Sequence, residues 1–147
     1  MTVGAVKVSF DLERFVVAQA PVYERVRAEL AAGAKTSHWM WFIFPQLRGL
    51  GRSAMAEHFG LAGSAEAEAY LAHPTLGARL RECTRLVLDV RNKSPHEIFG
   101  TPDDLKFHSS MTLFAAVARE EPLFRQALDQ YFGGRRDTLT EQMLGGD

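Results

Sequence analysis

The sequence has few of the features that mark secreted, membrane or metal-binding proteins. Cys83 is the only cysteine, so a disulfide within the chain and a thiolate metal cluster are both excluded. The longest apolar run, from Trp39 to Pro45, is far shorter than the roughly 20 residues that cross a bilayer, and the N-terminus lacks the apolar stretch of a signal peptide. We therefore expect a cytoplasmic protein without a membrane partner. Cys83 is interpreted as a small buried hydrophobic residue rather than a nucleophile.

An excess of charge of one sign is also missing. The 17 Lys and Arg residues are balanced by 18 Asp and Glu residues, which gives a formal net charge of −1. Because no global positive field would attract phosphate backbones, a nucleic-acid partner is not expected. Hydrophobic residues make up 46% of the chain and include ten Phe and two Trp, which excludes an intrinsically disordered protein and is enough for a core.

The β-branched residues Val and Ile are scarce beside Leu and Ala, and this composition favours helix over strand. We predict an all-α, mainly helical fold, with a single compact globular domain of six to eight short helices over residues 10–147. An N-terminal arm precedes it over residues 1–9. Val6 to Phe10 alternate between apolar and polar side chains, as either an edge strand or a loose terminal arm would.

Turn and cap residues set the expected boundaries of the helices. Ser94-Pro95-His96-Glu97 has the pattern of a capping box, and Thr101-Pro102-Asp103-Asp104 repeats that pattern at the start of a longer helix. Between such positions, the apolar periodicity indicates helices over residues 11–19, 21–33, 64–73, 74–90, 102–118 and 122–132. A short helical turn that ends at Gly100 follows the capping box, and a last frayed turn begins near Thr138.

The segment from Lys35 to Ser53 combines residue types that suit an anionic ligand. It contains no acidic residue, and two glycines, Gly49 and Gly51, flank Leu50 just before Arg52. Glycines let backbone N–H groups converge on an anion, and a helix starting at Ser53 would add its dipole. The aromatic run before this loop could form the wall of a nucleotide site. The alternative is that the aromatic residues fill the core and the glycines only form a turn.

A second segment, from Lys106 to Phe114, places polar residues beside an apolar helix face. Phe107, Met111 and Phe114 share one face and are expected in the core, whereas Lys106 and Ser109 lie on neighbouring faces. Hydroxyl side chains are poor helix formers, so local stability does not account for them. They are interpreted as one wall of a pocket, and the alternative is close packing of this helix against a neighbour.

The histidines show no metal-ligand pair such as HxxxH, so neither a metal site nor a cofactor is expected. Asp104 and His108 lie four positions apart on the expected helix and could form the oriented carboxylate–imidazole pair that a general base needs. Surface pairing of these two residues is the alternative. His38, beside the aromatic run, is the other candidate proton carrier.

One run of residues is distinctive enough to compare with known families: His38-Trp39-Met40-Trp41-Phe42-Ile43-Phe44-Pro45-Gln46-Leu47, followed by Gly49-Leu50-Gly51-Arg52-Ser53. Together with 14–16, 18–19, 69–77 and 104–114, it resembles the bacterial family catalogued as domain of unknown function 1810, over roughly residues 10 to 140. The resemblance implies a mainly helical fold and carries over no established activity. Some members carry the label calpastatin, a disordered protease inhibitor, which does not suit this composition. The helical layout is also similar to that of NADAR domains, which act on ADP-ribose derivatives.

Two hypotheses follow. In the first, the protein binds a phosphate-bearing, nucleotide-like ligand such as an ADP-ribose derivative, with its hydrolysis left open. The residues expected to neutralise phosphate, stack on a base or fix orientation are Lys35, His38, Trp39, Trp41, Gln46, Arg52, Ser53, Lys106 and Ser109. The candidate catalytic residues are His38, Asp104 and His108.

In the second hypothesis, the protein is a helical interaction module, monomeric or homodimeric. The expected outer face of the 74–90 helix carries Arg79, Arg81, Arg85 and Arg91 and would meet an acidic partner. The first hypothesis requires the polar residues of the two segments to converge on one concavity. The second predicts that they scatter, or that an apolar surface patch pairs two copies.

Overall fold

A computed structural model describes residues 9–145, and these residues form ten helices. In chain order they are α1 (Glu13–Gln19), α2 (Tyr23–Ala32), α3 (Met40–Ile43), α4 (Ala54–Phe59), α5 (Ser64–Ala72), α6 (Pro74–Leu88), α7 (Pro95–Phe99), α8 (Asp103–Val117), α9 (Leu123–Phe132) and α10 (Thr138–Gly145). Residues 9–145 contain no strand, and a single parallel bridge joins Leu47 to Leu61. The all-α prediction is confirmed. Most of the alternating stretch Val6 to Phe10, and of the proposed arm 1–9, lies outside the described residues.

The helix count exceeds the six to eight that the sequence predicted. The difference comes from α3 and α4, which have four and six residues. No helix was expected at α3, and at α4 a helix start at Ser53 was considered only as part of the anion-site hypothesis. Elements of one or two turns are too short for apolar periodicity to reveal. No helix within residues 9–145 is both long and apolar enough to cross a membrane.

The predicted caps have different outcomes. Ser94 and Glu97 form the expected capping box at the start of α7. The prediction that Thr101 caps the next helix was wrong. Pro102 occupies the N-cap position of α8, and no side chain caps that helix. The Thr101 hydroxyl lies instead 3.4 Å from the carboxylate of Asp104.

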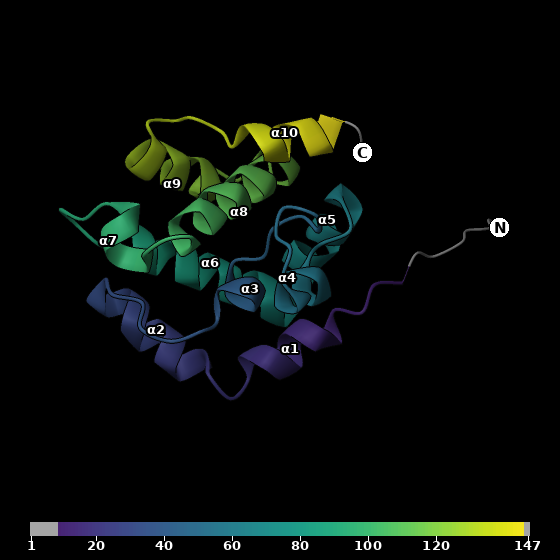
Figure 1. Ribbon diagram of the computed structural model, residues 1–147, viewed down its shortest axis with the longest axis horizontal. Helices are drawn as coiled ribbons and strands as arrows, with labels where there is room; N and C mark the ends of the chain where they lie inside the picture. Colours follow the sequence, from purple (N-terminus) through teal and green to yellow (C-terminus); the bar gives the residue numbers. More distant parts are fainter. Residues whose placement is uncertain (1–8, 146–147) are drawn as a thin grey trace.

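The helices are arranged around α6 and α8. α6 packs against α1, α2, α3, α5 and α9, and α8 packs against α5, α7, α9 and α10. In Figure 1, α8, α9 and α10 lie above α6, and α1 and α2 lie below it. α8 is buried on most of its circumference, including Ser110 and Thr112, so for these two hydroxyl residues the close-packing alternative holds.

The aromatic core joins the two segments that the sequence singled out. The ring of Phe44, from the first segment, meets that of Phe107 in α8 edge-on, at 5.0 Å between centroids. Phe99 contacts both rings. Such aromatic pairs contribute about 0.5–1.5 kcal/mol beyond the burial of their area. The core therefore fixes the loop that follows Phe44 beside the first half of α8.

Candidate functional site

A cleft with a volume of about 450 Å³ opens between three parts of the chain. One wall is the loop between α3 and α4 together with α4 itself, the second is the first half of α8, and the third is the start of α10. The lining residues are Gln46, Leu50, Gly51, Arg52, Ser53, Ala56, Pro102, Leu105, Lys106, Ser109, Asp137 and Leu139. We call this the Arg52–Lys106 cleft. The predicted binding residues Gln46, Arg52, Ser53, Lys106 and Ser109 therefore line one concavity.

The loop wall is held by backbone hydrogen bonds and by close packing. The N–H of Leu61 donates to the carbonyl of Gln46 at 3.0 Å, and the N–H of Arg48 donates to the carbonyl of Leu61 at 2.8 Å. These bonds close a loop around α4. A Cβ atom on Gly51 would lie only 2.7 Å from the Cβ of Ala56, so only glycine fits this approach.

Ser53 and Arg52 have different positions at the end of this loop. The Ser53 hydroxyl accepts a hydrogen bond from the N–H of Ala56 at 3.0 Å and caps α4, so it serves the fold as well as the cleft. The Arg52 side chain is exposed and makes no ion pair or hydrogen bond within residues 9–145. Its guanidinium is therefore available to a ligand.

On the α8 wall, Lys106 is held over an aromatic ring. Its ammonium lies 5.1 Å from the centroid of the Trp41 ring and 3.8 Å from the Asp103 carboxylate. The first distance is within the range of a cation–π contact. Trp41 also lines a hollow of about 10 Å³ that shares Gln46, Ala56 and Lys106 with the cleft. Trp41 thus lies behind the cleft, and its buried Nε1 has no hydrogen-bond partner.

The third wall contains Asp137, which the sequence analysis missed. Its Oδ2 atom accepts hydrogen bonds from the N–H of Thr140 at 3.0 Å and from the hydroxyl of Ser109 at 3.2 Å. Its own N–H donates to the hydroxyl of Thr112 at 2.9 Å. Asp137 therefore caps α10 and fixes it to α8. Asp is among the preferred N-cap residues, and Asp137 precedes Thr140 by three positions, so this cap could have been found in the sequence.

Besides Trp41, three more predicted binding residues do not line the cleft. The Lys35 ammonium lies 2.8 Å from the Asp103 carboxylate and donates to the carbonyl of Ser37 at 2.6 Å. Lys35 therefore fixes the chain after α2 to the start of α8. Trp39 is 1% exposed, and its Nε1 donates to Glu29 at 2.9 Å, so the expected stacking of Trp39 on a base is wrong. His38 is exposed and is not among the cleft residues.

Glu29 holds the start of this segment through several hydrogen bonds. Its carboxylate accepts hydrogen bonds from the backbone N–H groups of Thr36 and Ser37, from the Ser37 hydroxyl and from Trp39. Burial alone would raise the pKa of Glu29, but these hydrogen bonds lower it to about 2. Glu29 is thus a charged anchor for residues 36–39.

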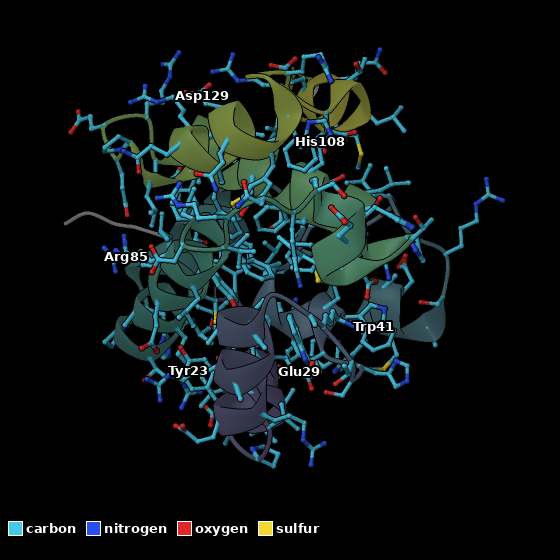
Figure 2. All side chains as sticks on the ribbon, turned by 90° about the vertical axis from the view of Figure 1, so that its left-hand side faces the viewer. Tyr23, Glu29, Trp41, Arg85, His108 and Asp129 are labelled. Atoms are coloured by element: carbon cyan, nitrogen blue, oxygen red, sulfur yellow. The ribbon has the colours of Figure 1, made fainter. Side chains whose placement is uncertain are left out.

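The expected pair of Asp104 and His108 does not form, so this candidate general base was wrong. The His108 Nε2 atom lies 2.8 Å from the carbonyl oxygen of Arg135, and the imidazole stacks on Phe132 at 4.1 Å between centroids. Figure 2 shows His108 in the upper part of the view, among α8, α9 and α10, with Glu29 and Trp41 below. Asp104 faces His96, at 3.7 Å.

Cys83 is buried, and its burial raises the pKa of the thiol to about 12. A thiol of this kind is a poor nucleophile near neutral pH, in agreement with its interpretation as a small core residue. Within residues 9–145, no group of three or more His, Cys, Asp or Glu residues is arranged to hold a metal ion.

Comparison with known proteins adds the following. The family model described as "Protein of unknown function (DUF1810)" matches residues 9–144. The crystal structure of the conserved hypothetical protein Rv1873 from Mycobacterium tuberculosis is similar with a TM-score of 0.91 and 55% sequence identity, covering 92% of this chain and 97% of that chain. No curated protein matches the chain.

Proposed function

The chain belongs to the DUF1810 family of proteins of unknown function, and we propose that it binds a small phosphate-bearing, nucleotide-like ligand, such as an ADP-ribose derivative, in the Arg52–Lys106 cleft. One observation carries the proposal: two cationic side chains from distant parts of the sequence line one cleft of ligand size. The volume of about 450 Å³ is within the range of about 300–1,000 Å³ that is typical of small-molecule sites.

The charges of the cleft suit a phosphate group. Arg52 has no partner within the described residues, and the Lys106 ammonium has a long contact of 3.8 Å with Asp103 and lies 5.1 Å from the centroid of the Trp41 ring. A guanidinium can donate two parallel hydrogen bonds to phosphate oxygens, and an ammonium adds a point charge. Both groups can therefore turn to an anion without breaking a short ion pair.

The remaining lining suits the uncharged part of such a ligand. Leu50, Leu105 and Leu139 give apolar surface against which a base or the face of a sugar can pack. The Oδ1 atom of Asp137 accepts no hydrogen bond within residues 9–145, because all of the Asp137 side-chain bonds go to Oδ2. A carboxylate oxygen of this kind can accept hydrogen bonds from ribose hydroxyls. None of the candidate proton carriers lines the cleft, so the proposal is limited to binding.

Calorimetric titration with ADP-ribose and AMP, and with adenosine as the ligand without phosphate, tests the proposal. We expect saturable binding of the phosphate-bearing ligands, and a loss of affinity of about tenfold or more in Arg52→Ala and in Lys106→Ala, because each substitution removes a charge-assisted contact. Arg25→Ala, which removes an exposed arginine from α2, is the matched control and should bind as the wild type does. The absence of binding by all three ligands, or equal affinities in all variants, would contradict the proposal.

A second candidate function is pairing of two copies of the chain, and it also has an observation in its favour. Leu105 and Leu139, at the rim of the cleft, are each 61% exposed. The interaction-module hypothesis also predicted an acidic partner for the arginines of α6, and this prediction has less support. Arg81 already pairs with Glu121 at 2.8 Å, and the Arg79 guanidinium lies over the Tyr23 ring. Light scattering of wild type and Leu105→Glu tests the pairing. A dimer that the substitution dissociates would favour it, and a wild-type monomer at high concentration would contradict it.

A further inference from the structure

A second cavity, with a volume of about 480 Å³, also borders the start of α10. Its lining residues are Ala115, Ala116, Arg119, Arg125, Arg136 and Glu141. They come from the end of α8 and the turn after it, from α9, and from the start of α10. We call this the arginine cavity. It shares no lining residue with the Arg52–Lys106 cleft, so it is a separate concavity.

The charges that line the arginine cavity are unbalanced. Three guanidinium groups face a single carboxylate, an excess of two positive charges. That carboxylate, on Glu141, makes only a long contact of 3.9 Å with Arg136. Arg119 and Arg125 form no ion pair or hydrogen bond within residues 9–145.

Three other acidic residues nearby lie outside the lining of the arginine cavity. Glu121 is engaged by Arg81, whose Nε and Nη2 donate to its two carboxylate oxygens at 2.8 and 3.1 Å. Glu68 and Glu120 line a neighbouring hollow, of which Arg119 forms one side. Among the side chains that line the arginine cavity, positive charges therefore exceed negative charges by two, although Arg119 also borders the hollow that contains Glu68 and Glu120.

The shape of the arginine cavity also suits a ligand. Two alanines of α8, Ala115 and Ala116, take the place of side chains that could fill it. The positive charges around the cavity repel one another, and an anion bound between them offsets this repulsion by its attraction to each of them. Guanidinium groups present planar sets of donors that match the oxygens of phosphate groups in pairs. An excess of two charges favours an anion with more than one charge.

We propose that the arginine cavity binds a small polyvalent anion of the polyphosphate class, through Arg119, Arg125 and Arg136. This site is independent of the function proposed for the Arg52–Lys106 cleft. The same group can come from an inorganic polyphosphate or from the phosphate chain of a nucleoside triphosphate. The charge count and the absence of aromatic residues from the lining favour the inorganic form, because no side chain of the cavity offers a ring on which a base could stack.

Calorimetric titration with inorganic tripolyphosphate, pyrophosphate and orthophosphate tests the proposal. We expect affinity to rise with the charge of the probe, and ATP to bind no more tightly than tripolyphosphate. The variant Arg119→Ala/Arg125→Ala should bind tripolyphosphate about tenfold or more weakly, since it removes two charge-assisted contacts. Both side chains are exposed, so the double variant should fold normally, which its thermal unfolding midpoint checks.

Three further variants show where the anion binds. Arg25→Ala/Arg85→Ala removes the same charge from exposed positions on α2 and α6 and should leave the affinity unchanged. Because the Arg52–Lys106 cleft is itself proposed to take a phosphate group, the titration is repeated in the Arg52→Ala/Lys106→Ala background. The further change Arg119→Ala/Arg125→Ala should weaken binding there by the same factor, which separates this site from the cleft. Glu141→Gln removes the only carboxylate and should increase the affinity for tripolyphosphate about threefold, whereas a purely structural role of these arginines predicts no gain.

Several outcomes would overturn the proposal. They are the absence of saturable binding of tripolyphosphate by the wild type, an unchanged affinity in Arg119→Ala/Arg125→Ala, and an equal loss in Arg25→Ala/Arg85→Ala, which would indicate attraction by charge alone. Tighter binding of ATP than of tripolyphosphate would contradict the inorganic class. Amide shifts in the NMR spectrum that include Ala115 and Ala116 are expected on titration, and shifts confined to the cleft would contradict the assignment of the site.

Discussion

The two halves of the segment from Lys35 to Ser53 have opposite environments, although the sequence suggested the same role for both. In the first half, Lys35 pairs with Asp103 and Trp39 pairs with Glu29, and both contacts lie inside the fold. In the second half, Arg52 is exposed without a partner and lines a cleft. The comparison teaches that a residue's type indicates what it can bind, whereas its availability depends on partners elsewhere in the chain.

The largest expected effect is that of Trp39→Ala. Trp39 is fully buried, and its removal leaves a cavity and takes one hydrogen-bond donor from the Glu29 carboxylate. We expect a loss of about 3–5 kcal/mol in the free energy of unfolding, measured by denaturant titration. Trp41→Ala is the matched control, because Trp41 is half-buried and its Nε1 makes no hydrogen bond. Equal losses in the two variants would contradict the structural role assigned to the buried contact between Trp39 and Glu29.

Glu29→Gln should cost less, about 1–3 kcal/mol at pH 7, because the amide nitrogen cannot accept the hydrogen bonds that the carboxylate accepts. The same carboxylate gives a pH dependence. Its pKa is about 2 in the folded protein, below the ordinary value of about 4.3, so its contribution to stability is present above pH 4.3 and is lost as the pH falls toward 2. Unfolding titrations between pH 6 and about 2 should show this loss in the wild type, and a smaller one in the variant.

Gly51→Ala tests the second half of the segment. The added Cβ would lie 2.7 Å from the Cβ of Ala56, so the loop must shift, at a cost of about 1–3 kcal/mol. Thermal unfolding measures this cost. Gly145→Ala is the control, since nothing lies within 4 Å of a Cβ at that position. If ligand binding occurs in the cleft, Gly51→Ala should weaken it as well, and Gly145→Ala should not.

The smallest effect on stability is expected for Arg52→Ala. The side chain is exposed and unpaired within residues 9–145, so the free energy of unfolding should change by about 0.5 kcal/mol or less. Lys35→Ala, its counterpart in the first half, removes a buried partner of Asp103 and should destabilise the fold measurably. Similar stabilities of the two variants would show that the two halves do not differ as the contacts indicate.

The fold class and most long helices could be predicted because they depend on local patterns. The cap at Ser94 and the apolar face of Phe107, Met111 and Phe114 needed only neighbours within a few residues. The meeting of Gln46, Arg52 and Ser53 with Lys106 and Ser109 was also anticipated, from two segments that were each unusual for a helical core.

What could not be predicted depends on long-range partners. Trp39 donates its Nε1–H to Glu29, which lies on α2. The His108 imidazole stacks on Phe132 and contacts the carbonyl oxygen of Arg135 instead of pairing with Asp104. Neither contact can be inferred from the spacing of residues along the sequence. Whether the residues of the cleft bind a ligand stays a prediction until the titrations are made.

The start of α10 borders two cavities, so ligand binding in one cavity can affect ligand binding in the other. Asp137 and Leu139 belong to the Arg52–Lys106 cleft, whereas Arg136 and Glu141 belong to the arginine cavity. The start of α10 therefore contributes residues to both cavities, and Asp137 holds it to α8 through hydrogen bonds with Ser109 and Thr112. A ligand that shifts α10 from one cavity changes the volume of the other cavity. Thermodynamic linkage then requires that each ligand changes the affinity of the other by the same factor.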